Sequence, residues 1–225
     1  MNIIKRERMD LYGTKQQKAL LWIVVVSFSI FLLLSSLYLF LYNPRFYDHQ
    51  YAKNGVYAQF GYDETWTATK ELWQYMQFHA EFTSDFYSEQ DQLHMIDVRN
   101  MLLKVQYIFF AAIMIFLLGL LYYYSFSRES FYFFLYEVFY STSTLTIFIL
   151  LMFVTSAFFF DSAFFLFHRF FFSNNYWLMD PAMDKLVLLF PQNFFLNIFL
   201  SVLGVTFIFA LIIFGLSLYI KKRYL

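Results

Sequence analysis

Polar and apolar positions divide the chain into four long charge-free segments and two mixed segments between them. Residues 19–42, 105–127, 138–160 and 194–220 contain no Asp, Glu, Lys or Arg. A helix needs about 20 apolar residues to cross roughly 30 Å of hydrocarbon. The pattern predicts an all-α membrane protein with four transmembrane helices, in a single integral membrane domain that covers residues 1–225.

The first apolar segment follows a basic N-terminus, so a cleaved signal peptide is the alternative interpretation. Its apolar core is too long for a signal peptide, and the sequence "YLFLYNP" offers no small-residue cleavage site. We therefore expect a retained membrane-spanning helix.

Composition supports a membrane protein. Phe, Tyr and Trp make up 25% of the residues, and charged residues make up 14%, against about 25% in soluble domains. The net charge of zero argues against a nucleic-acid partner. The absence of cysteine excludes disulfides, thiolate nucleophiles and thiolate metal ligands.

The charged residues predict the orientation. Basic residues lie near the N-terminus, in the short connection after residue 127 and at the C-terminus, whereas segments 43–104 and 161–193 are rich in Asp and Glu. By the positive-inside rule, both termini of this multi-pass cell-membrane protein are expected in the cytoplasm. Segments 43–104 and 161–193 then form an extracytoplasmic cap.

The first cap segment contains two recognisable patterns. The sequence "NGVYAQFGYD", residues 54–63, combines turn signals with alternating aromatics and predicts a short β-hairpin. The sequence "TWTATKELWQYMQFHAEF" predicts an amphipathic helix, on which His79 is expected to be a packing or solvated histidine.

A helix start follows at Ser88 and Asp91, which form a capping-box pattern, and nothing interrupts this helix before the second apolar segment. Asp91, His94 and Asp97 share one face of it. We expect Asp97 to bond an imidazole nitrogen of His94 and fix its tautomer. The alternative is a hydrated interfacial ion pair.

The second cap segment places His168 in a run of phenylalanines. Phe164, Phe165, Phe171 and Phe172 lie three or four positions away, so a helix would surround the imidazole with rings and keep it neutral. The alternative is a histidine that reaches the lipid headgroups. Because the connection at 127–130 is short, spans two and three are expected to be neighbours. The two imidazoles should then meet at the outer membrane–cap interface.

Common catalytic motifs are missing, including G-x-S-x-G, H-E-x-x-H and the P-loop. Two histidines without a protein nucleophile are suited to general acid–base chemistry on a substrate that carries its own nucleophile. A bis-histidine haem or metal site is one alternative. A non-enzymatic lipid- or lipoprotein-binding membrane subunit is another.

At "SEQDQLHMIDVRNML" and "FHRFFFSNNYWLMDPAMDKLVLLFP", and in its four-span layout, the chain resembles the Gram-positive membrane-protein family that includes the lipoprotein intramolecular transacylase. The resemblance implies transfer of the sn-2 acyl chain of a diacylglyceryl-modified lipoprotein to the α-amine of its N-terminal Cys, giving the lyso form. It implies that His94 and His168 are the catalytic residues; their order stays open. Besides the lipoprotein, membrane lipids are expected partners, and no metal or cofactor is required.

Five further residues are candidates for substrate binding or support of the site: Asp97, Arg169, Asn174, Trp177 and Asp184. The second histidine or Arg169 is expected to stabilise the oxyanion of the tetrahedral intermediate.

Overall fold

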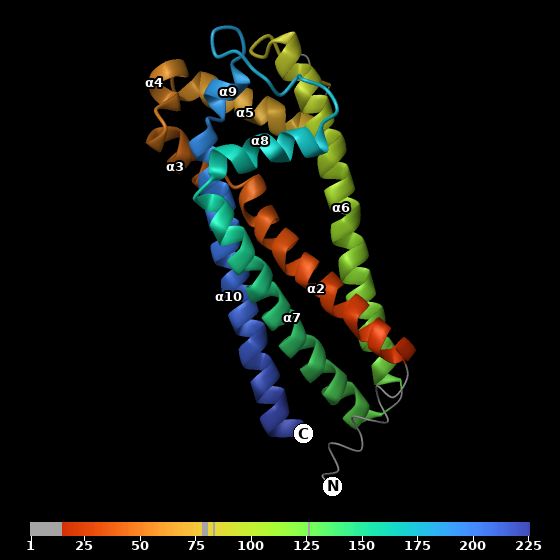
Figure 1. Ribbon diagram of the computed structural model, residues 1–225. Coiled ribbons are helices and arrows are strands. Elements are labelled where there is room, and N and C mark those ends of the chain that lie inside the picture. Colours follow the sequence, from red (N-terminus) through yellow and green to blue (C-terminus); the bar gives the residue numbers. More distant parts are fainter. Residues whose placement is uncertain (1–14, 78–80, 83, 126) are drawn as a thin grey trace. The chain divides into compact units, whose positions relative to one another are not determined.

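The computed structural model describes residues 15–77, 81–82, 84–125 and 127–225. Its four long helices are α2 (Lys15–Leu41), α6 (Glu89–Tyr124), α7 (Arg128–Ala157) and α10 (Gln192–Tyr224) (Figure 1). Each is long and apolar enough to cross a membrane, and each overlaps one of the four predicted segments. The predicted all-α class with four transmembrane helices is confirmed.

Five shorter helices complete the described chain: α3 (Pro44–Lys53), α4 (Val56–Phe60), α5 (Tyr62–Met76), α8 (Phe160–Phe171) and α9 (Leu186–Leu189). The described residues contain no strand, so the β-hairpin predicted for residues 54–63 is wrong. Gly55 and Gly61 have φ angles of 74° and 77° and flank α4, where they serve as helix ends. Glycine at positive φ suits a helix end as well as a hairpin turn, so the sequence signal was ambiguous.

The chain forms two compact units, each assembled from separated stretches of sequence. The long-helix unit takes Met1–Leu37, Gln106–Val154 and Val202–Leu225, and the histidine unit takes Tyr38–Val105 and Thr155–Ser201. The histidine unit spans both predicted cap segments, and it contains His49, His94 and His168. A single domain over residues 1–225 stays a prediction.

Aromatic stacking and one close approach hold the long-helix unit together. Phe28 of α2 stacks on Phe116 of α6 with ring centroids 4.1 Å apart, and Tyr123 of α6 stacks on Phe134 of α7 at 4.0 Å. A Cβ atom at Gly119 would lie 2.8 Å from Val24 Cγ2, so glycine permits close packing of α6 on α2. The contact between Tyr123 and Phe134 joins α6 and α7 at their short connection, and Phe28 of α2 stacks on rings of both helices.

The histidine unit has its own core of tyrosines and aliphatic residues from α3, α5 and α9. Hydrogen bonds satisfy the buried hydroxyl groups, as burial requires. The Tyr51 hydroxyl lies 2.7 Å from Thr69 Oγ1, and the Tyr87 hydroxyl donates to the Ala68 carbonyl at 3.0 Å. This core supports the first turns of α6, which carry His94.

Candidate functional site

The position of His94 follows from the way in which α6 begins. The Asp91 backbone N–H donates to Ser88 Oγ at 3.0 Å, and the Ser88 N–H donates to Asp91 Oδ2 at 3.1 Å. These reciprocal bonds confirm the predicted capping box, with Asp in the place usually taken by Glu. His94 lies on the next turn of α6, before the charge-free segment 105–127, and is 7% exposed.

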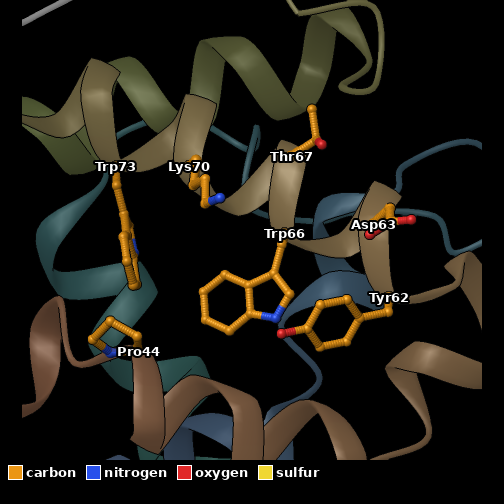
Figure 2. Close-up of a pocket in the computed structure, with 7 residues that line it drawn as sticks. All are labelled: Pro44, Tyr62, Asp63, Trp66, Thr67, Lys70 and Trp73. Carbon is orange, nitrogen blue, oxygen red and sulfur yellow. The ribbon is translucent and has the colours of Figure 1, made fainter.

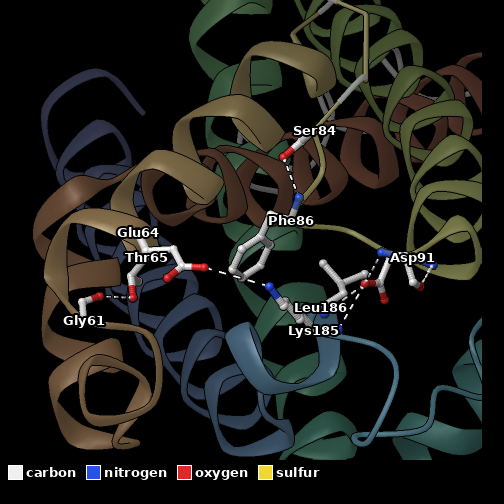
Figure 3. A network of polar contacts seen from close by, with 9 residues as sticks. Gly61, Glu64, Thr65, Ser84, Phe86, Asp91, Lys185 and Leu186 are labelled. Carbon is white, nitrogen blue, oxygen red and sulfur yellow. Dashed lines mark hydrogen bonds and ion pairs between the residues drawn. The ribbon is translucent and has the colours of Figure 1, made fainter.

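Polar contacts attach these first turns of α6 to the loop between α8 and α9. Asp91 Oδ2 also accepts from the N–H groups of Lys185 at 3.1 Å and Leu186 at 3.3 Å (Figure 3). Ser88 Oγ donates to Asp184 Oδ1 at 2.6 Å, and Gln90 Nε2 donates to the Leu178 carbonyl at 2.6 Å. The loop that follows α8 is therefore held against the helix that carries His94.

His168 is the buried residue of α8, at 8% exposure, among large apolar neighbours that are partly or fully exposed. The Phe164 ring lies 4.4 Å from the imidazole and the Trp177 ring 5.2 Å from it, at an interplanar angle of 32°. Of the four rings predicted around it, Phe164 and Phe172 contact the imidazole, whereas Phe165 and Phe171 are largely exposed. His168 Nδ1 lies 2.7 Å from the Phe164 carbonyl oxygen. A carbonyl can only accept, so Nδ1 carries the proton and Nε2 keeps its lone pair in the neutral imidazole.

The two imidazoles lie side by side, as the topology predicted. Their centroids are 5.8 Å apart at an interplanar angle of 33°. The Phe172 ring contacts both, at 5.1 Å from His94 and 5.6 Å from His168. This arrangement brings together two residues that are far apart in the sequence.

The surroundings of both imidazoles favour the neutral form. Burial is the main cause that lowers the pKa of His94 to about 4; the neighbouring His168 lowers it further, and Asp97 opposes the shift. Burial also lowers the pKa of His168, against the opposing effect of the bond to the Phe164 carbonyl. Two neutral imidazoles can accept and donate protons without a preceding deprotonation.

Asp97 and Asn174 lie near the pair, and Asp97 bonds Asn174 instead of the predicted partner His94. Asn174 Nδ2 donates to Asp97 Oδ2 at 2.7 Å, while His94 Nδ1 is buried without a hydrogen-bond partner in the described part of the chain. The backbone carbonyl of Asn174 accepts from Trp177 Nε1 at 2.9 Å. Asp97 thus connects to His168 through Asn174 and Trp177.

Of the remaining candidate residues, Arg169 is exposed and Asp184 is buried. Arg169 is exposed on α8 and makes no hydrogen bond or ion pair with any residue that the structure describes. Asp184 is buried and accepts from Ser88 and from the Asp180 N–H at 2.8 Å, so it supports the start of α6. His79 lies outside the described residues.

Sequence reasoning missed Gln90 and the supporting role of Asp91. Gln90 binds a carbonyl of an irregular loop, and no local pattern shows where such a carbonyl lies. For Asp91 a signal existed, because a carboxylate at the N-terminus of a helix often binds backbone N–H groups.

Within the described ranges, no group of three or more His, Cys, Asp or Glu side chains is arranged to hold a metal ion. His94 and His168 would supply two nitrogen ligands and no more.

Comparisons with known proteins identify the family. The family model for the lipoprotein intramolecular transacylase Lit matches residues 22–195. The fold is similar to that of the membrane-integral Lit from Bacillus cereus, with a TM-score of 0.79 at 23% identity over 92% of this chain and 96% of the other. No curated protein matches the sequence.

Two further structures of the Bacillus cereus protein carry a substitution of histidine. The variant with alanine gives a TM-score of 0.71 at 23% identity, over 99% of this chain and 98% of the other. The variant with arginine gives 0.70 at 22% identity, over 97% of each chain. The structures share the fold, and the family model covers well over half of the sequence. This chain therefore belongs to the lipoprotein intramolecular transacylase family of membrane-integral acyltransferases, which act on lipoproteins.

Proposed function

We propose that the chain moves the sn-2 acyl chain of a diacylglyceryl-modified lipoprotein to the α-amino group of its N-terminal Cys. The product is the lyso form, with an N-acyl group and an S-monoacylglyceryl group. The observation that carries this proposal is the pair of buried, neutral imidazoles 5.8 Å apart. Such a pair suits a reaction in which the substrate supplies its own nucleophile.

His168 acts as the general base in this proposal. An α-amine has an unperturbed pKa of about 7.7–8.0 and attacks an ester only as the neutral amine. As its nitrogen bonds to the ester carbonyl carbon, His168 Nε2 accepts the proton that the nitrogen loses. The imidazolium then delivers this proton to the departing glycerol oxygen as the C–O bond breaks. The bond from Nδ1 to the Phe164 carbonyl supports this assignment, because it leaves Nε2 available.

His94 stabilises the tetrahedral intermediate. The protonated nitrogen of its neutral imidazole donates to the ester oxygen as negative charge develops there. Burial supports this role, since a hydrogen bond is stronger where water is excluded. Arg169, which is exposed, is a weaker candidate for the same task.

The main contribution of the protein is positioning. Nucleophile and ester belong to one molecule, and well-oriented intramolecular reactions gain roughly 7–11 kcal/mol over bimolecular ones. The rings of Phe164, Phe172 and Trp177 around the histidines reduce access of water, which would otherwise hydrolyse the ester.

A reporter lipoprotein, co-expressed with this chain, tests the proposed reaction. Acyl transfer within one molecule leaves the total mass unchanged, so the N-terminal peptide must be fragmented. Alkaline treatment gives a second readout, because an N-linked amide survives conditions that release both ester-linked chains. A substrate with different chains at sn-1 and sn-2 then shows which chain moved. Well-expressed protein that leaves the N-terminal amine free would contradict the proposal.

Asn174 is proposed to be a positioning residue, because it connects Asp97 to the Trp177 ring that lies against His168. Asn174→Ala is expected to lower kcat for N-acylation about tenfold with little change in KM, since hydrogen bonds to charged groups contribute about 1.5–3 kcal/mol. Asp97→Asn alone should be milder than loss of either histidine. The amount of N-acylated reporter peptide measures the activity of Asn174→Ala and of Asp97→Asn.

The exchanged pair Asp97→Asn with Asn174→Asp provides the control. It reverses donor and acceptor and is expected to restore most of the activity. If the exchanged pair is as impaired as Asn174→Ala, or if Asn174→Ala has full activity, Asn174 has no positioning role.

We further propose that both termini lie in the cytoplasm and that the two histidines lie at the outer face of the membrane. The distribution of Lys and Arg supports this orientation. The chain has no cysteine, so a single cysteine introduced at exposed Asp85 can be labelled without background. We expect a membrane-impermeant maleimide to label this cysteine in intact cells. Absence of labelling would contradict the proposed orientation.

A further inference from the structure

An open pocket of about 590 Å³ lies beside α5 in the histidine unit. Three aromatic side chains of α5, Tyr62, Trp66 and Trp73, line it together with Pro44 of α3 (Figure 2). Within the described part of the chain, none of these side chains makes a ring contact or hydrogen bond with His94 or His168. The pocket is therefore a feature separate from the proposed catalytic site.

A hydrogen bond at the edge of the Trp66 ring holds the ring in position. Its Nε1 donates to the Tyr57 hydroxyl at 3.0 Å, and this hydroxyl donates to Asp48 Oδ1 at 2.6 Å. The Trp73 ring lies 6.0 Å from Trp66 at 75°, and the Tyr62 ring lies 6.4 Å from it at 57°. The π-face of each aromatic ring carries partial negative charge, and groups of aromatic rings bind ammonium ions.

Polar groups of both signs line the same pocket. Asp63, Thr67 and Lys70 follow each other at helical spacing on α5, over about 10 Å of helix. All three are exposed, and neither Asp63 nor Lys70 has a hydrogen-bond or ion-pair partner within the part of the chain that the structure describes. A carboxylate at one end and an ammonium group at the other complement a zwitterion.

We propose that this pocket binds the headgroup of an amine-bearing phospholipid, such as phosphatidylethanolamine. The lipid ammonium lies against Trp66 and Tyr62 and pairs with Asp63, and the lipid phosphate pairs with Lys70 and Thr67. The place of the pocket in the chain favours a lipid over a soluble ligand. Pro44 lies shortly after Leu41, where helix α2 ends. Lipid headgroups lie at the level where membrane-spanning helices end.

Native mass spectrometry of the purified full-length protein tests this proposal without measuring acyl transfer. Phosphatidylethanolamine and phosphatidylglycerol with identical acyl chains are titrated separately, and the retained lipid is quantified. We expect tighter binding of phosphatidylethanolamine. Asp63→Asn and Tyr62→Leu should each weaken that binding roughly threefold to tenfold. Lys70→Gln should weaken binding of both lipids, because both carry the phosphate.

Asp85→Asn is the matched control, since Asp85 is also exposed in the histidine unit and lies outside the pocket. It should leave binding of both lipids unchanged. Equal affinity for the two lipids would overturn the proposal, as would equal effects of Asp63→Asn and Asp85→Asn. Displacement of the lipid by a lysine-containing peptide that binds more tightly would assign the pocket to a polypeptide instead.

Discussion

His168→Ala is expected to lower the rate of N-acylation by about 10²–10⁴-fold, the usual contribution of general acid–base catalysis. The variant loses Nε2, the proposed proton acceptor, while α8 keeps its exposed apolar surface and should still insert into the membrane. His94→Ala is expected to have an effect of similar size. The base-resistant N-acyl group on the reporter peptide measures both variants against wild-type protein at equal expression.

Two further variants make this experiment specific. His49→Ala removes an exposed imidazole from the same unit and should leave the rate unchanged. His168→Asn keeps a donor for the Phe164 carbonyl but lacks any group in the place of Nε2, so it should be as inactive as the alanine variant. Activity of His168→Asn close to wild type would refute the assignment of His168 as the base.

The second large effect concerns stability. Asp91→Ala is expected to lower the free energy of unfolding by about 2–4 kcal/mol, because an N–H group that loses its acceptor costs about 1–3 kcal/mol. The carboxylate is fully buried and accepts from the N–H groups of Ser88, Lys185 and Leu186. Thermal unfolding in detergent, followed by circular dichroism, measures the loss.

Asp85→Ala is the control, since it removes an exposed carboxylate near the same helix start. Asp91→Asn keeps an acceptor oxygen and should fall between wild type and the alanine variant. Equal melting temperatures for Asp91→Ala and Asp85→Ala would show that Asp91 does not hold the loop.

The sequence predicted those parts of the fold that depend on local or topological rules. Charge-free length identified the four long helices, and Ser88 with Asp91 identified the start of α6, because a capping box is a local pattern. The meeting of His94 and His168 was predicted from the short connection between spans two and three, and the helix that brings His168 to His94 is α8. The hairpin failed because Gly55 and Gly61 suit a helix end as well as a turn.

Partner choice within the site could not be predicted. Asp97 bonds Asn174, which lies in an irregular loop. The path of this loop depends on the bond from Gln90 of α6 to the Leu178 carbonyl and on the bond from Ser88, just before α6, to Asp184. His168 and Arg169 are adjacent, yet one is buried and the other exposed, since successive residues of a helix point about 100° apart. Sequence spacing predicted rings around His168 but did not show that Arg169 would be exposed.

The surface of α8 limits how this enzyme can be handled. Phe170 is 82% exposed, and Phe158, just before the helix, is 81% exposed. In water each such ring would be an unfavourable apolar surface of the kind that drives aggregation. Although the histidine unit has its own tyrosine-rich core, it would precipitate if excised as a soluble catalytic fragment. Assays must therefore supply detergent micelles or lipid nanodiscs, even for residues that never enter the hydrocarbon.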